Sequence, residues 1–204
     1  LAVDAMHVEQ NLIKEHVGSQ DQVAAAFGGL NRIDFGGAEK ISVRPIIMKP
    51  ERLQSLQDQL LLFFTGFSRH ASEIAAEQIK KTPERSQELT AMHQMVDKAV
   101  AILADDAAPL EEFGRLLDQS WKIKRRLTHL VSNSQIDAIY ERGIKAGAIG
   151  GKLCGAGAGG FMLFFVPQEK QAQVKEALKD LLHVPFKFEN QGSQVIFNSP
   201  QDFV

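Results

Sequence analysis

Residues 155–160 read Gly-Ala-Gly-Ala-Gly-Gly, the run most suited to chemistry in this 204-residue sequence. Glycine adopts positive φ angles and lets a ligand approach the backbone closely. Exposed N–H groups in such a loop can hold phosphate oxygens. Spacing alone leaves two readings open, an anion-binding loop and a tight connection between two strands.

Two well-known phosphate-binding patterns do not fit this loop. The spacing Gly155-x-Gly157-x-x-Gly160 matches the dinucleotide fingerprint, but that fingerprint requires a helix after the glycines. Here the apolar run 161–166 follows and ends at Pro167, which is typical of a buried strand. A P-loop is excluded because no Gly-Lys-Ser/Thr follows.

Two acidic residues near the start of the chain could divide the tasks of phosphoryl transfer. Glu9 lies late in the first expected helix, and Asp21 follows the turn after it. This chemistry needs one carboxylate to orient or deprotonate the attacking hydroxyl and oxygen ligands for Mg²⁺. The alternative is that Asp21 caps a helix and Glu9 is a surface charge, which the two residues alone favour.

Other candidate sites are weaker. Ser68 and Arg69 lie between an expected strand and helix, where they could bind an anion or simply cap the helix. His7-Val-Glu9 begins like a zinc-deaminase site, but the single cysteine, Cys154, cannot complete one. The other histidines show no metal spacing, and there is no Gly-x-Ser-x-Gly of a serine hydrolase.

The periodicity of apolar residues predicts an α+β fold in which helices cover one face of a sheet. Helices are expected at residues 1–16, 22–27, 69–81, 83–103, 109–121, 136–143 and 168–182. Strands are expected at 30–35, 41–46, 60–65, 152–154, 161–166, 186–188 and 195–197.

Composition excludes several classes of protein. The net charge is −2 and 44% of residues are hydrophobic, which gives no reason to expect nucleic acid or an anionic membrane as a partner. We interpret the basic residues 122–126 as a solvated helix face. Residues 147–166 are apolar but too rich in glycine for a stable membrane helix. One cysteine fits a reducing compartment, and we expect a cytoplasmic protein.

Three stretches together resemble the GHMP kinases, in the order found in that family. They are residues 18–31 (GSQDQVAAAFGGLN), 60–74 (LLLFFTGFSRHASEI) and 150–165 (GGKLCGAGAGGFMLFF). The last resembles the third motif of the family. The middle one, with Thr-Gly-x-x-Arg, is most similar to the branch that phosphorylates heptose 7-phosphate.

The resemblance implies a fold, a reaction and roles for particular residues. It implies a remnant of the N-terminal domain at residues 1–48 and a ferredoxin-like C-terminal domain with added helices at 49–204. The implied reaction transfers the γ-phosphate of ATP to the anomeric hydroxyl of a sugar phosphate. Asp21 would be the catalytic aspartate and Glu9 the Mg²⁺ ligand, while Ser68 and Arg69 would bind the far phosphate of the substrate. The loop residues expected near the phosphates of ATP are Gly155, Ala156, Gly157, Gly159 and Gly160.

The sequence departs from the family pattern at three places. Ala158 replaces a glycine of the third motif, and Ser19 stands where the heptose branch often has lysine. The second motif, Pro-x-x-x-Gly-Leu-x-Ser-Ser, is absent, and the chain opens inside an expected helix. We therefore expect a piece truncated at its N-terminus that is inactive alone. Two alternatives stay open, a kinase for another sugar such as fucose or galactose and a non-catalytic ligand-binding relative.

Overall fold

The computed structural model describes residues 1–36, 40–66 and 71–196, and it divides into two compact units. The first comprises Leu1–Lys14, Gly18–Pro45 and the chain from Phe188 onward. The second comprises Glu15–Val17 and Ile46–Lys187. Among the described residues no helix is both long enough and apolar enough to span a membrane.

The first unit holds the helices and the hairpin expected near the start of the chain. Helix α1 (Ala2–His7) continues into a π-helix, η1 (Val8–Ile13), which ends where Lys14 adopts a left-handed conformation. Helix α2 (Gln20–Phe27) follows, and strands β1 (Asn31–Phe35) and β2 (Ile41–Pro45) pair antiparallel. The sequence predicted all of these elements by type, but not the π-helix, which marks a local irregularity often found at functional sites.

The far end of the chain packs against the end of α2. The N–H of Gly29 donates to Glu189 O (2.8 Å), and the N–H of Ser193 donates to Ala25 O (2.9 Å). A side chain at Gly192 would overlap the backbone of Ala26. The prediction of a strand at residues 186–188 is wrong, because these residues form no strand pairing in the structure. Residues 195 and 196 also lack strand structure, while residue 197 is outside the described residues.

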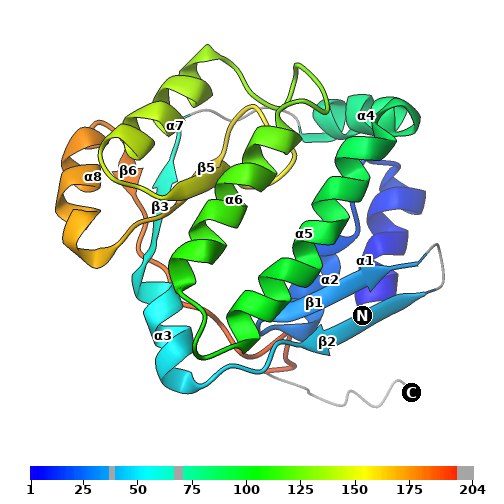
Figure 1. Ribbon diagram of the computed structural model, residues 1–204. Coiled ribbons are helices and arrows are strands. Elements are labelled where there is room, and N and C mark those ends of the chain that lie inside the picture. Colours follow the sequence, from blue (N-terminus) through cyan, green and yellow to red (C-terminus); the bar gives the residue numbers. More distant parts are fainter. Residues whose placement is uncertain (37–39, 67–70, 197–204) are drawn as a thin grey trace. The chain divides into compact units, whose positions relative to one another are not determined.

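The second unit is built on one antiparallel sheet. Its strands are β3 (Leu60–Phe64), β4 (Gly150–Leu153), β5 (Phe161–Phe165) and β6 (Leu182–His183), in the order β4-β5-β3-β6. Its helices are α3 (Pro50–Asp58), α4 (Ala71–Lys81), α5 (Ser86–Ala104), α6 (Leu110–Lys124), α7 (Ser134–Lys145) and α8 (Gln171–Ala177), joined in part by the short turns η2 (Thr82–Arg85) and η3 (Gln168–Lys170) (Figure 1). Helices between β3 and β4, a β4–β5 hairpin, and α8 before β6 give a ferredoxin-like βαββαβ topology, which confirms the predicted α+β class. Helix α3 has no counterpart among the expected elements.

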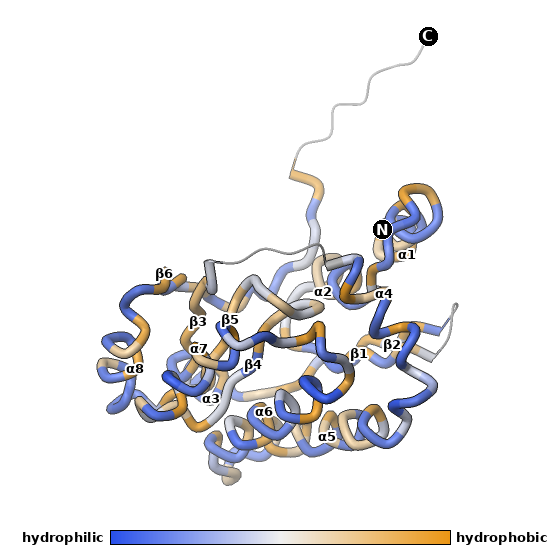
Figure 2. Tube along the Cα trace, turned by 90° about the horizontal axis from the view of Figure 1, so that it is seen from above, coloured by the Kyte–Doolittle hydropathy of each residue, from blue (hydrophilic) through white to orange (hydrophobic). Residues whose placement is uncertain are grey.

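The core of this unit lies between the sheet and helices α6, α7 and α8. Side chains of a strand alternate between its two faces, so Met162 and Phe164 of β5 share one face. The ring of Phe164 stacks against Tyr140 of α7, with centroids 6.2 Å apart. Figure 2 shows hydrophobic and hydrophilic residues alternating around the turns of α5 and α6, as expected for helices with one buried side. The buried cluster comprises Leu61, Phe63, Trp121, Val131, Ile136, Ile139, Tyr140, Ala148, Leu153, Met162, Phe164, Val166, Val174 and Leu178.

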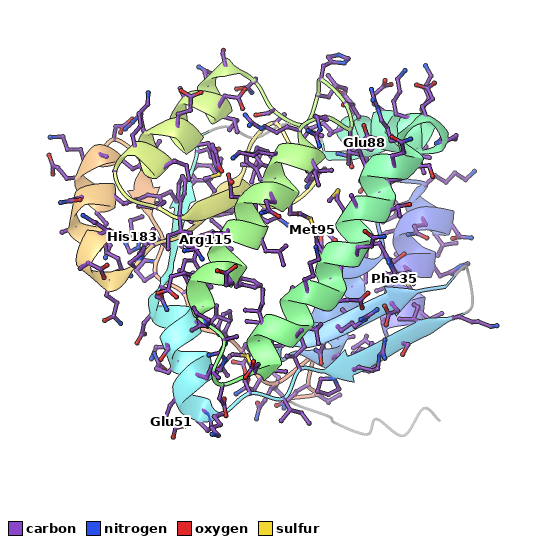
Figure 3. The ribbon with its side chains drawn as sticks, viewed as in Figure 1. Phe35, Glu51, Glu88, Met95, Arg115 and His183 are labelled. Atoms are coloured by element: carbon purple, nitrogen blue, oxygen red, sulfur yellow. The ribbon has the colours of Figure 1, made fainter. Side chains whose placement is uncertain are left out.

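The edge strand β6 is very short. His183, labelled in Figure 3, packs its ring 5.3 Å from that of Phe63. Partial burial lowers the pKa of His183 below its usual value, so its imidazole is favoured in the neutral form. After Val184, whose N–H donates to Leu62 O (2.8 Å), the ladder ends.

Two glycines allow α6 to lie directly against β4. A side chain at Gly150 would overlap the carbonyl oxygen of Gly114, and one at Gly114 would lie 2.7 Å from the Phe165 ring. The backbones of helix and strand thus approach more closely than any larger residues allow. This contact fixes the position of β4 and therefore the start of the glycine loop that follows it.

The close approach predicts a specific sensitivity. Gly150→Ala should lower the free energy of unfolding by about 3 kcal/mol, because the added methyl group can only fit if α6 or β4 moves. Urea unfolding measures this change. Gly18→Ala is the matched control, since no atom lies within 4 Å of its added Cβ. Equal stability of the two variants would contradict the packing described here.

Candidate functional site

Glu9 and Asp21 are linked in the first unit by the residue next to Asp21. The side-chain amide of Gln22, in the first turn of α2, donates to Glu9 Oε2 at 2.5 Å. A second link joins the same two elements, since Gln10 Nε2 donates to Ser19 Oγ at 3.1 Å. These bonds hold the π-helix η1 against the beginning of α2, the turn that carries Asp21.

The carboxylate of Asp21 is exposed at the N-terminal turn of α2. Val23, two residues later, is fully buried and anchors the helix. Within residues 1–36, 40–66 and 71–196, no side chain forms a hydrogen bond or ion pair with Asp21. A fixed and unpaired carboxylate can accept a proton from a bound hydroxyl or orient it.

The oxygen atoms around Glu9 suit a hard cation. Glu9 is half-buried, and the Oε1 atom of Gln22 is buried without a hydrogen-bond partner in the described part of the chain. The described residues contain no cluster of three or more His, Cys, Asp or Glu that could hold a metal ion. Mg²⁺ commonly takes only one or two carboxylates and completes its shell with water and substrate phosphates. Glu9 and the Oε1 atom of Gln22 are thus the oxygen atoms that this region offers to a Mg²⁺ ion.

The glycine loop connects β4 to β5 in the second unit. Its φ angles are positive at Gly155 (76°), Gly157 (138°), Ala158 (59°) and Gly160 (101°). Added Cβ atoms at Gly155 and Gly160 would meet nothing within 4 Å, whereas one at Gly157 would lie 2.8 Å from the backbone of Val131. The loop is thus packed against Val131 in its middle and open at both ends.

Most N–H groups of this loop are available for a ligand. Ala158 donates its N–H to Val131 O at 2.9 Å. Across the described ranges, the other five residues of 155–160 donate to no acceptor. Several unpaired N–H groups in a loop with positive φ angles form an anion-binding concavity. Ala158 keeps the turn with a methyl group in place of the usual glycine, and this residue is buried.

Two lysines give this end of the sheet a positive charge. Lys124, the last residue of α6, donates its Nζ to Gly155 O at 2.5 Å. Burial, with repulsion from Lys152 on β4, lowers the pKa of Lys124 to about 8. Burial also raises the pKa of the Cys154 thiol, although both lysines act in the opposite direction. Cys154 therefore stays protonated at neutral pH and is not a nucleophile.

The basic residues 122–126 are only partly the solvated face expected from the sequence. Arg125 lies over the rings of Trp121 and Tyr140, 5.9 and 5.6 Å from their centroids, and pairs with Asp137 at 2.9 Å. Lys124 contacts the glycine loop. The expectation is wrong for these two residues, because α6 points its last turn at the β4–β5 connection. Lys122 and Arg126 are exposed, as predicted.

The structure places the predicted site residues in three groups. Glu9 and Asp21 lie together in the first unit, and the loop 155–160 lies in the second. Ser68 and Arg69 are outside the described residues. Sequence reasoning missed Gln22, Lys124 and also Gln78, which bonds to the loop. The proximity of Gln22 to Asp21 was the only available signal, because the other two contacts join distant parts of the chain.

Known proteins match this chain over most of its length. Residues 99–184 match the family "GHMP kinases C terminal". The chain is 37% identical over 180 residues to a D-glycero-alpha-D-manno-heptose 7-phosphate kinase of Campylobacter jejuni, covering 86% of this chain and 52% of the relative. It therefore spans about half the length of that relative.

Solved structures support the same fold. A putative sugar kinase of Campylobacter jejuni is 29% identical with a TM-score of 0.62, over 94% of this chain and 55% of the other. A D-glycero-D-manno-heptose 1-phosphate kinase of Bacteroides thetaiotaomicron has a TM-score of 0.67 at 24% identity, over 94% and 52% of the two chains. At that identity the second likeness supports the fold alone.

The partly buried ammonium of Lys124 predicts a pH dependence of stability. In the unfolded chain its pKa returns to about 10.5, so between pH 8 and 10.5 the unfolded state binds more protons than the folded state. The penalty for burying the charge is present below pH 8 and disappears as the pH rises to 10.5. The free energy of unfolding of the wild type should therefore rise relative to that of Lys124→Met across this window.

Urea unfolding at several pH values measures this difference. Lys122→Met is the control, because Lys122 is exposed on the same helix. The difference in free energy of unfolding between the wild type and this variant should stay constant over the same pH range. A difference between wild type and Lys124→Met that stays constant from pH 8 to 10.5 would show that Lys124 is not desolvated.

Proposed function

We propose that the protein is an ATP-dependent sugar kinase of the GHMP class, because residues 99–184 match the family "GHMP kinases C terminal". The proposed reaction transfers the γ-phosphate of ATP to the anomeric hydroxyl of a sugar phosphate. The proposed substrate is D-glycero-D-manno-heptose 7-phosphate, giving the 1,7-bisphosphate. This substrate is supported by the similarity to the relative from Campylobacter jejuni, which is named as a heptose 7-phosphate kinase.

The proposed domain assignment follows the same family. Residues 1–48 would be the remnant of the N-terminal domain that carries the catalytic aspartate, and 49–204 the C-terminal domain. ATP, Mg²⁺ and a sugar phosphate are the proposed partners, without nucleic acid or membrane. A cytoplasmic location is proposed from the single cysteine.

Asp21 is proposed to act on the sugar hydroxyl. The hydroxyl oxygen forms a bond to the γ-phosphorus, the bond from that phosphorus to the bridging oxygen breaks, and ADP leaves. The proton of the hydroxyl passes to the Asp21 carboxylate, which has no competing partner among the described residues. Such a base typically contributes about 10²–10⁴ in rate.

Glu9 is proposed to hold Mg²⁺, kept in place by the amide of Gln22. When bound, the ion would neutralise charge on the phosphates of ATP. The N–H groups of Gly155, Ala156, Gly157, Gly159 and Gly160 are proposed to face these phosphates. Ser68 and Arg69 are proposed to bind the far phosphate of the sugar, a role suited to an arginine fork.

Two rival functions differ in what they require of Asp21. A kinase for fucose or galactose would use the same acids with an unphosphorylated sugar. A non-catalytic sensor would bind a ligand and would need no base. An exposed Asp21 that has no partner among the described residues favours an enzyme over a sensor.

The test is ADP release by the full-length gene product with Mg²⁺-ATP and a panel of sugars. We expect turnover with heptose 7-phosphate and little with mannose, galactose or fucose, because only the first carries a phosphate that Arg69 could bind. Turnover with an unphosphorylated sugar would keep the kinase and contradict the heptose assignment. No ADP release with any sugar, together with sugar binding by calorimetry, would support the sensor.

A further inference from the structure

Side chains from three separate elements bind carbonyl oxygens of the glycine loop. Lys124 of α6 donates to Gly155 O (2.5 Å), and Gln78 of α4 donates to Ala156 O (2.7 Å). Thr65, just after β3, donates both its N–H and its hydroxyl to Gly160 O, each at 2.9 Å. These donors are distant in sequence from the loop and from one another. Because all three bind the glycine loop, the peptide groups of the loop have little freedom to change their orientation.

A hydrogen bond that fixes the orientation of a carbonyl group also fixes the N–H group in the same peptide unit. A trans peptide unit is planar, and its C=O and N–H point in opposite directions. The bond from Lys124 to Gly155 O therefore directs the N–H of Ala156 away from α6. In the same way, the bond from Gln78 to Ala156 O directs the N–H of Gly157 away from α4. Neither N–H has an acceptor in the described part of the chain.

Without these bonds the two peptide units could turn over. Gly155 and Gly157 permit a wide range of φ and ψ, so either peptide could rotate and offer a carbonyl oxygen in place of an N–H. A carbonyl facing a phosphate repels it, whereas an N–H donates a hydrogen bond to it. Only the orientation that presents the N–H groups can therefore bind an anion.

The contact made by Lys124 is unusual for a lysine. Its ammonium sits partly buried close to Lys152, and both features disfavour the charged form. An exposed lysine at the end of a helix would normally extend into water and avoid this penalty. The position of Lys124 is therefore better explained by what it does to the loop than by its own stability.

We propose that Lys124 and Gln78 are positioning residues that hold the N–H groups of Ala156 and Gly157 toward the polyphosphate of a bound nucleoside triphosphate. This inference rests on the proposed function, in which the loop faces the phosphates of ATP. It assigns to each residue a role through the backbone and not through direct contact with substrate. Both should therefore affect nucleotide affinity and leave sugar affinity unchanged.

The test compares variants of the full-length gene product. Lys124→Met and Gln78→Leu each remove one donor, and each should raise the KM for ATP about tenfold, the loss expected for one oriented hydrogen bond to a charged group. The KM for the sugar should stay within twofold of the wild type, because the two residues are proposed to act only through the loop that faces ATP. Lys124→Arg keeps a donor and should restore much of the ATP affinity. Lys122→Met is the matched control on α6 and should change neither constant.

Three measurements separate the possible failures. Thermal unfolding of each variant shows whether it folds, and calorimetry with ATP measures binding without turnover. If the wild type does not bind ATP, the proposed function fails and this inference with it. If the wild type binds ATP and the variants bind it equally well while their melting temperatures fall, the two residues only fasten the loop and the positioning role is wrong. If Lys122→Met weakens ATP binding as much as Lys124→Met does, the positioning role of Lys124 is also wrong.

Discussion

The constraint on which the second unit depends is the burial of β5 between two partner strands. Phe161–Phe165 pairs with β3 on one side and β4 on the other, while Met162, Phe164 and Phe165 are fully buried. The chain must therefore turn between β4 and β5 within residues 154–160, and the close packing of α6 at Gly150 fixes where that turn begins. The pairing of β4 with β5 thus requires the glycine loop at this place. Most N–H groups of the loop have no acceptor among the described residues.

In the first unit, the proposed function requires two acids that are held in place and stay reactive. A carboxylate that is fully paired cannot act as a base, and one that is free in solvent is poorly oriented. The bond from Gln22 to Glu9 orients one acid, and the first turn of α2 holds Asp21, which has no partner among the described residues. The irregular η1 turn positions Glu9 beside Gln22. Proposed catalysis in the first unit and proposed phosphate binding in the second thus rest on separate local structures.

Local patterns in the sequence predicted the parts of this structure that local physics decides. The apolar run before Pro167 gave β5, the spacing of three and four residues gave α5 to α7, and the glycines gave the β1–β2 hairpin and the loop. The rest depends on partners distant in sequence. Phe186 and Phe188 alternate like a strand, yet the ladder ends at β6 and the segment from Phe188 packs with α2. Lys124 has the charge pattern of a solvated helix end, and only the fold shows that it meets Gly155.

The role of Asp21 is tested most directly by the substitution Asp21→Asn in the full-length gene product. The quantities to measure are kcat, the affinity for ATP and the affinity for the sugar. The substitution keeps the size of the side chain but removes its capacity to accept the proton. We expect a fall in kcat of at least about 10²-fold with both affinities nearly unchanged. A kcat within twofold of the wild type would show that Asp21 is not the base, and the proposed mechanism would be wrong.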